Sequence, residues 1–232
     1  MLRTWKKSIS LLLVFALSIT ACAPAFAAEK NRISIDNIKI PNPSTRFIDF
    51  FTDYFKNHSS FSVLDRTGND INESFYKNNL NYYHSSDFKA IEIFVCDKVS
   101  SVCKHTEIKK FDSSASPNSS FVKKTISDIF YHPLTADIGD RFVEVWDTIT
   151  GTYVYNANTG KISEYSSPKL HVDFQNTGYG MSVYTENTST GAHLSSDKYT
   201  VTFTGSFDVK GTSYGVIYDY GHVYDELEGT PE

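Results

Sequence analysis

The feature that most constrains the fold is the alternation of apolar and polar side chains from Tyr199 to Val209. Tyr199, Val201, Phe203, Phe207 and Val209 occupy every second or fourth position, with threonine, serine and aspartate between them. Successive side chains of a β-strand point to opposite faces, so this period-two pattern predicts a strand with one buried face.

Similar alternation recurs through the second half of the chain, from Phe121 onward. The Asn- and Gly-containing segment 156–161 has the composition of a hairpin turn. Further strands are expected at Arg141–Tyr155, Leu170–Phe174, Tyr179–Val183 and Tyr214–Tyr224. Short strands separated by turn residues at regular intervals predict an antiparallel β-sandwich or barrel over residues 121–232.

The preceding residues, 28–111, predict a small α+β part. Apolar residues at three-and-four spacing follow Ser44 and Thr45, either of which can cap a helix that runs to about His58. A short strand at Phe61–Leu64 and a helix over residues 71–83 come next. The Ser- and Pro-containing segment 112–120 has linker composition and is the predicted domain boundary. The predicted fold class is therefore mainly β.

Two cysteines remain once the amino-terminal 27 residues are set aside, Cys96 and Cys103. Six residues separate them, and they lie between two apolar runs within a predicted hairpin over residues 88–111. A hairpin would place their sulfur atoms opposite each other, so a disulfide is expected. Metal binding and redox chemistry stay open as alternatives, although zinc sites usually need four ligands and redox pairs are usually C-x-x-C.

The amino terminus has the organisation of a signal peptide. Basic residues precede an apolar run of about 13 residues, Ile9–Ala21, which is too short to span a bilayer as a helix of about 20 residues. The triplet Ala25-Phe26-Ala27 predicts cleavage after Ala27 and secretion of a soluble chain. Ile19-Thr20-Ala21-Cys22 resembles a lipobox, so a chain anchored by a lipid on Cys22 is the alternative.

Net charge restricts the partners. Residues 1–27 hold three of the 22 basic residues and none of the 27 acidic ones, so the remaining chain carries a net charge of −8. An acidic chain without a basic cluster lacks the electrostatic footprint of nucleic-acid binding, and it gains no attraction from an anionic bilayer. No later stretch is apolar enough for a transmembrane segment. An extracellular glycan or protein is the expected partner.

Three carboxy-terminal segments carry a family resemblance: residues 155–161 (YNANTGK), 199–207 (YTVTFTGSF) and 218–222 (YDYGH). This part of the chain resembles secreted β domains of unknown function from Gram-positive bacteria. The resemblance implies a bacterial source and a β fold, and it brings no catalytic residues.

One candidate binding surface follows from the period of the last strand. Tyr214, Tyr218, Tyr220, His222 and Tyr224 fall at even positions and are predicted to share a face. This stripe is interpreted either as a half-buried sheet face or as an exposed aromatic platform on which sugar rings stack.

The evidence for catalysis is weaker. Gly211-Thr212-Ser213-Tyr214-Gly215 matches the G-x-S-x-G elbow of hydrolases, but strand residues follow it where a helix is required. The remaining histidines lack ligand spacing; they are His58, His84, His105, His132, His171 and His193. No catalytic residue, metal or cofactor is predicted.

The preferred interpretation is a secreted bacterial binding or interaction protein, without catalytic activity, at the cell surface or in the medium. A secreted hydrolase is one alternative. A β-pore-forming or antagonistic toxin is another, because a hairpin containing the strand Tyr199–Val209 has the alternation of membrane-inserting hairpins.

Overall fold

The computed structural model describes residues 40–106, 109–111, 120–138, 141–178 and 180–231. Its helices are α2 (Thr45–Lys56), the short 3-10 helix η2 (His58–Ser60), α3 (Asn72–His84) and α4 (Phe88–Lys98). Its strands are β1 (Phe61–Asp65), β2 (Val99–His105), β3 (Lys109–Phe111), β4 (Phe121–Thr135), β5 (Phe142–Asn156), β6 (Ile162–Tyr165), β7 (Lys169–Gln175), β8 (Ser182–Leu194), β9 (Val201–Ser213) and β10 (Val216–Gly229). The predicted fold class, a mainly β chain in which a small α+β part precedes antiparallel sheets, is confirmed.

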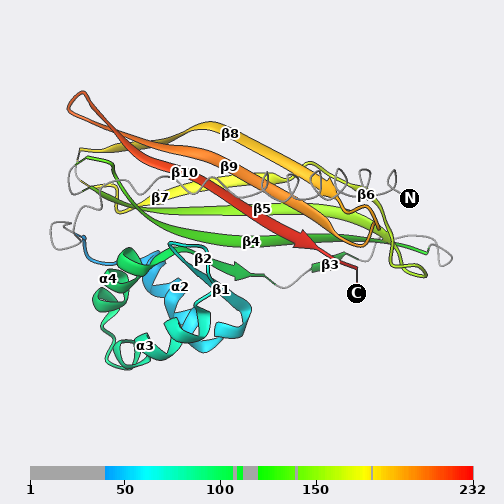
Figure 1. The fold of residues 1–232 in the computed structure, drawn as a ribbon, viewed down its shortest axis with the longest axis horizontal. Coiled ribbons are helices and arrows are strands. Elements are labelled where there is room, and N and C mark those ends of the chain that lie inside the picture. Colours follow the sequence, from blue (N-terminus) through cyan, green and yellow to red (C-terminus); the bar gives the residue numbers. More distant parts are fainter. Residues whose placement is uncertain (1–39, 107–108, 112–119, 139–140, 179, 232) are drawn as a thin grey trace, which may run out of the picture. The chain divides into compact units, whose positions relative to one another are not determined.

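The larger sheet contains seven strands among the described residues, in the order β1-β2-β4-β5-β6, with β3 also on β4 and β7 also on β5 (Figure 1). Long antiparallel pairing of β4 with β5, from Phe121–Asn156 to Thr135–Phe142, forms its centre. Strand β2 pairs with β4, so strands from both sides of the predicted linker belong to one sheet. Residues 112–119 of that linker lie outside the described residues.

The second sheet, β10-β9-β8, packs face to face on the first. The inner face of β9 is fully buried at Val201, Phe203, Phe207 and Val209, as its alternation predicted. The two sheets approach closely: a Cβ atom built on Gly151 of β5 would lie 2.2 Å from the Phe203 ring. The sheets therefore form an open sandwich with an apolar core between them.

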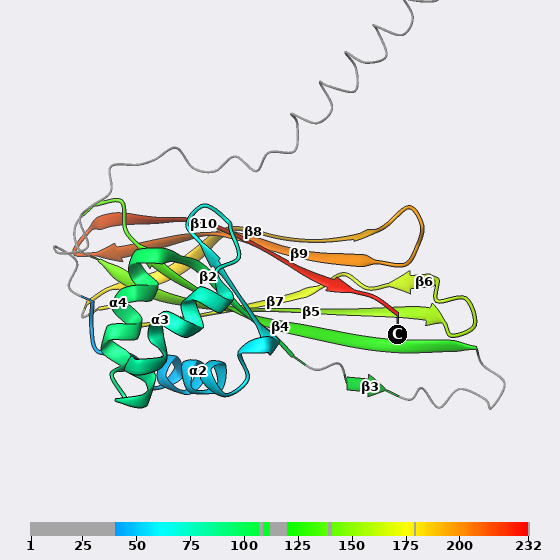
Figure 2. The ribbon, with the colours of Figure 1, turned by 60° about the horizontal axis from the view of Figure 1, so that its bottom comes forward.

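Helices α2, α3 and α4 cover the opposite face of the larger sheet near β1 and β2 (Figure 2). The neighbouring residues Phe130 and Tyr131 of β4 illustrate the two faces, because Phe130 packs in the core between the sheets and Tyr131 packs among the helices. The helix-side core is strongly aromatic; α2 alone contributes Phe47, Phe50, Phe51, Tyr54 and Phe55.

Two side-chain caps fix where helices α2 and α4 begin. The Ser44 hydroxyl accepts a hydrogen bond from the Phe47 amide at 3.0 Å, as expected for the predicted cap of α2. The Asp87 carboxylate accepts one from the Ala90 amide at 3.0 Å and starts α4. The predicted hairpin over residues 88–111 is wrong, because its first half is this helix.

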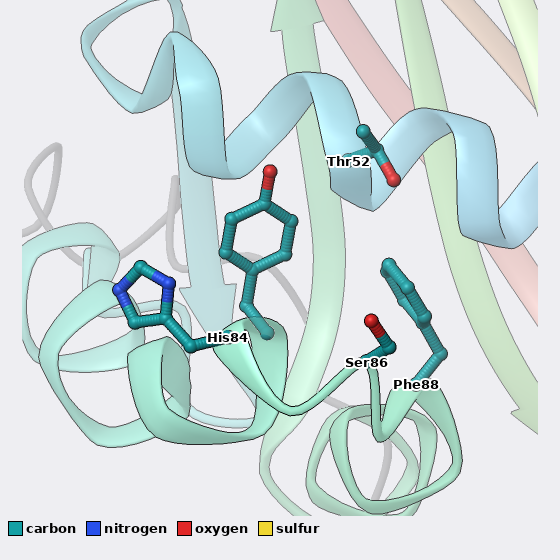
Figure 3. A pocket seen from close by; sticks show the side chains of 5 residues that line it. Thr52, His84, Ser86 and Phe88 are labelled. Carbon is teal, nitrogen blue, oxygen red and sulfur yellow. The ribbon is translucent and has the colours of Figure 1, made fainter.

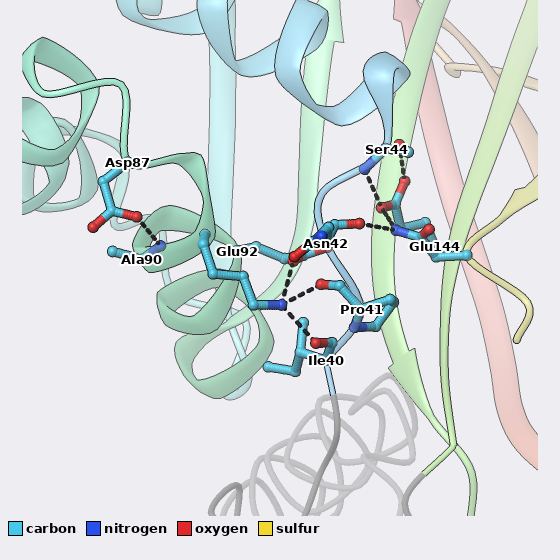
Figure 4. A network of polar contacts seen from close by, with 10 residues as sticks. Ile40, Pro41, Asn42, Ser44, Asp87, Ala90, Glu92 and Glu144 are labelled. Atoms are coloured by element: carbon cyan, nitrogen blue, oxygen red, sulfur yellow. Dashed lines mark hydrogen bonds and ion pairs between the residues drawn. The ribbon is translucent and has the colours of Figure 1, made fainter.

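A partly buried polar network joins the segment before α2 to the sheet and to α4 (Figure 4). The Ser44 hydroxyl donates a hydrogen bond of 2.6 Å to Glu144 of β5. The Lys89 ammonium donates to the Ile40 and Pro41 carbonyls and lies 3.2 Å from the Glu92 carboxylate. These contacts hold residues 40–44 against both α4 and β5.

Candidate functional site

The predicted tyrosine face does not exist as one surface. Tyr220 is buried, with 6% of its surface exposed, and Tyr218 is half-buried. Tyr214, His222 and Tyr224 are exposed. The prediction that all five side chains share one face is therefore wrong.

A β-bulge in β10 is the reason. The pairing register with β9 shifts between Asp219 and Gly221, and Gly221 has a φ of +107°. One extra residue reverses the alternation, so Val223 and Asp225 point inward after the bulge. Even positions thus face inward before the bulge and outward after it.

The separated residues have separate partners. The Arg141 guanidinium lies 5.7 Å from the ring centroid of Tyr218, and burial raises the pKa of Tyr220 to about 12. On the outer face, His222 Nδ1 lies 2.7 Å from an oxygen of Asp208. These residues do not form a flat aromatic platform.

The turn that joins β9 to β10 is the most exposed apolar feature in the described part of the chain. We call Tyr214, Gly215, Val216 and Ile217 the hairpin tip; it lies at the left of the orange-to-red hairpin in Figure 1. Tyr214 is 88% exposed, Ile217 65% and Val216 43%. Positive φ values at Tyr214 and Gly215 make the two-residue turn that the right-handed strand twist favours.

The G-x-S-x-G match lies at this same turn and lacks the geometry of a nucleophile elbow. Ser213 ends β9 and β10 follows after two residues, so no helix succeeds it. Its hydroxyl is buried and has no hydrogen-bond partner among the described residues. The site therefore offers Ser213 no general base.

The predicted disulfide is also wrong: Cys96 and Cys103 are both free thiols. Cys96 lies in α4 and its environment includes Tyr131 on the helix side of the larger sheet, whereas Cys103 belongs to the core between the sheets. The larger sheet separates the two sulfur atoms. Burial raises the pKa of both thiols, which keeps them protonated at neutral pH.

Cys103 instead joins a polar cluster at the edge of the core. Its sulfur lies 3.5 Å from Asp128 Oδ2 and 3.7 Å from His105 Nδ1, and these two atoms are 2.8 Å apart. The hydrogen bond with Asp128 raises the pKa of His105. One nitrogen of His105 contacts both the thiol and the carboxylate, so the arrangement is not a relay in which a histidine activates a cysteine with its second nitrogen.

A second cluster lies deeper between the sheets. His132 Nε2 is 2.9 Å from Asp225 Oδ2 and 3.2 Å from Asp147 Oδ1, and all three side chains are almost completely buried. Burial opposes protonation of His132, but Asp225 and then Asp147 outweigh it and raise its pKa to about 10. Burial raises the pKa of Asp147 to about 6. This closed ionic group ties β4, β5 and β10 together.

Sequence reasoning missed both clusters for an identifiable reason. Cys103 and His105 are two apart on one strand, so a shared face could be read from the sequence. Asp128 joins them only through the register of β2 on β4, in which His105 is paired with Asp128. The residues of the second cluster come from three strands that are far apart in the sequence, so their spacing along the chain does not indicate that they meet.

A hollow beside the helices contains another histidine (Figure 3). It is lined by Thr52, Tyr83, His84, Ser86 and Phe88. The His84 ring and the Ser86 hydroxyl lie on opposite sides of it, and no carboxylate or thiol is among the lining residues. The hollow brings together no catalytic set.

The signal-peptide prediction, including Ala27 and Cys22, concerns residues outside those the structure describes. None of the helices between residues 40 and 231 that are described has the length and apolarity needed to cross a bilayer. Comparison with models of protein families, with curated proteins and with solved structures found no match.

Proposed function

We propose that this chain is an exported bacterial binding protein without catalytic activity, and that its hairpin tip contacts a partner protein. Cleavage after Ala27 would release it into the medium; acylation of Cys22 would retain it at the cell surface. The observation that carries the proposal is the exposure of Tyr214 and Ile217 at a two-residue turn between two long paired strands.

Burial of the apolar side chains of the hairpin tip against a partner would be energetically favourable. Burying a side chain such as isoleucine stabilises a complex by roughly 1.5–3 kcal/mol. Because the tip is fixed by strand pairing up to Ser213 and Val216, little conformational entropy is lost when it docks. The exposed tyrosine has the amphipathic character of residues that dominate binding energies at interfaces.

The side-chain chemistry favours a protein over a glycan. Sugar rings stack on flat aromatic faces, but the tip offers one aromatic ring and two branched aliphatic side chains, Val216 and Ile217. The tyrosines that suggested a glycan platform are divided between two faces by the bulge at Gly221. Aliphatic groups gain most from an apolar recess on another protein.

The two alternatives lack comparable support. A hydrolase requires an activated nucleophile, and Ser213 has no hydrogen-bond partner among the described residues. A membrane-inserting hairpin requires β9 to leave the core, where Phe203 and Phe207 are completely buried. Either activity therefore demands a rearrangement, whereas binding through the tip does not.

The test is site-specific photo-cross-linking in the bacterium that produces the protein. A photoreactive residue replaces Ile217 at the tip or Tyr165 of β6, an apolar side chain that is also exposed, at 45%. We expect a single protein adduct from position 217 and none from position 165. Added wild-type protein should compete with the adduct, and protein carrying Ile217→Asp should not.

Three outcomes would contradict the proposal: no adduct from position 217, the same adducts from both positions, or an adduct to glycan alone. Ile217 is mostly exposed, so the aspartate variant is expected to fold, which circular dichroism checks.

A further inference from the structure

We propose that Cys103, His105 and Asp128 form a zinc-binding site, independent of the hairpin tip. The evidence is geometric and begins with three donor atoms of the kinds that zinc prefers: a thiol sulfur, an imidazole nitrogen and a carboxylate oxygen.

The three atoms have the spacing of ligands around one ion. The Sγ–Nδ1, Sγ–Oδ2 and Nδ1–Oδ2 distances are 3.7, 3.5 and 2.8 Å. A triangle of this size has a centre about 2 Å from each corner, and zinc forms bonds of about 2.0–2.3 Å to these donors. An ion slightly out of the plane therefore reaches all three atoms, with a small opening of the Nδ1–Oδ2 contact.

Rigid strand pairing positions the donors. Cys103 and His105 are two positions apart on β2, so their side chains lie on the same face of the strand. Asp128 is the residue of β4 that is paired with His105. The Thr106 amide donates a hydrogen bond of 3.3 Å to Asp128 Oδ1, which leaves Oδ2 directed at the other two donors. Such supporting bonds orient metal ligands in known sites.

The cluster is open on one side. The His105 side chain is 55% exposed, whereas Cys103 and Asp128 are buried. An ion can thus enter past His105, and a water molecule can complete four-coordination on that side. The His132–Asp147–Asp225 group is sealed and lacks sulfur, so it is a poorer site for zinc.

Coordination changes the charge of the cluster in a defined way. The thiol forms its bond to zinc as a thiolate and releases one proton to solvent. His105 binds through Nδ1, so the proton that this atom shares with Asp128 leaves it: an imidazolium releases that proton to solvent, and a neutral ring carries its proton on Nε2 instead. No electron is transferred. The ion replaces the thiol proton and the hydrogen bond between His105 and Asp128.

The test uses the reduced, tag-free mature chain and two ions, Zn²⁺ titrated against a chromophoric chelator and Co²⁺ followed by absorption. We expect one ion per chain and a thiolate-to-cobalt charge-transfer band. Cys103→Ser should abolish the band. His105→Gln and Asp128→Asn should each weaken Zn²⁺ binding at least tenfold.

Two matched controls accompany these variants. Cys96→Ser removes the other thiol, and His222→Gln removes one member of the exposed His222–Asp208 pair. Both should bind Zn²⁺ and Co²⁺ as the wild type does. Zn²⁺ should raise the Tm of the wild type and of both controls, and at the same concentration it should raise the Tm of His105→Gln by less.

The proposal is overturned if the wild type binds no stoichiometric Zn²⁺, or if His105→Gln and Asp128→Asn bind it as tightly as the wild type. It is also overturned if the cobalt band disappears in Cys96→Ser and persists in Cys103→Ser. If Cys103→Ser does not fold, the His105 variant decides, because that side chain is mostly exposed.

Discussion

At the scale of single residues, Glu92 is the clearest case of a side chain whose charge is set by its surroundings. Its side chain is completely buried in α4, and one carboxylate oxygen has no hydrogen-bond partner among the described residues. Burial raises its pKa to about 7; Lys89 opposes this shift and Glu144 adds to it. The folded protein therefore binds a proton at Glu92 more tightly than the unfolded chain.

This difference predicts how stability depends on pH. The folded pKa is raised above the unfolded value of 4.5, so stability should fall as pH rises from about 4.5 to about 7. Glu92→Gln removes the titrating group, so the loss of stability between pH 5 and pH 8 should shrink by on the order of 2 kcal/mol. Urea denaturation of the wild type and of Glu92→Gln at pH 5 and at pH 8 measures this loss of stability.

Asp147 also has a raised pKa, so it too makes stability fall as pH rises. Because the wild type and Glu92→Gln both contain Asp147, the difference between their pH dependences isolates the contribution of Glu92. Identical pH slopes for the two proteins would show that Glu92 does not titrate in this range.

At the scale of elements, the sequence predicted α2 and β9 but failed at α4 and at the two faces of β10. It also placed a strand at Tyr179–Val183, which overlaps β8 (Ser182–Leu194) at two residues only. The run from Phe88 to Cys96 is short and apolar, a pattern that buried strands and buried helices share. The cap at Asp87 was the available signal for a helix. In β10, the bulge at Gly221 could not be read from alternation, because one inserted residue leaves both halves of the pattern intact.

The start of α2 combines a local and a long-range interaction in one side chain. The Ser44 hydroxyl accepts from the Phe47 amide and donates to the buried Glu144 carboxylate. Ser44→Ala should destabilise the protein by about 1–3 kcal/mol, because it removes a helix cap and a hydrogen bond to a charged group. Chemical denaturation checks this value.

Ser85→Ala is the matched control for that experiment. Its hydroxyl donates to the Asn81 carbonyl on an exposed surface, so its loss should cost less than about 0.5 kcal/mol. Equal effects of the two substitutions would show that the contact between Ser44 and Glu144 contributes nothing measurable.

At the scale of the whole molecule, the sandwich brings together residues that are distant in sequence. The alternation of β9 predicted a buried face but not which sheet would cover it. The deep cluster joins His132, Asp147 and Asp225 across both sheets, a grouping that the register of β4 on β5 and the packing of β10 against these strands define. Candidate sites of this kind depend on topology, which one sequence does not specify.

Gly151 offers the most direct test of that topology. A Cβ atom there would lie 2.2 Å from the Phe203 ring, which belongs to the opposite sheet. Gly151→Ala should therefore force the two sheets apart locally and destabilise the protein by roughly 2–3 kcal/mol. In a Phe203→Leu background the smaller side chain leaves room, so the same substitution should cost at least 1 kcal/mol less, a coupling within the range measured for residues in contact. Urea denaturation of the four proteins in this cycle gives the coupling energy. Purely additive costs would mean that Phe203 does not lie over Gly151, and the packing of β9 on β5 described above would then be incorrect.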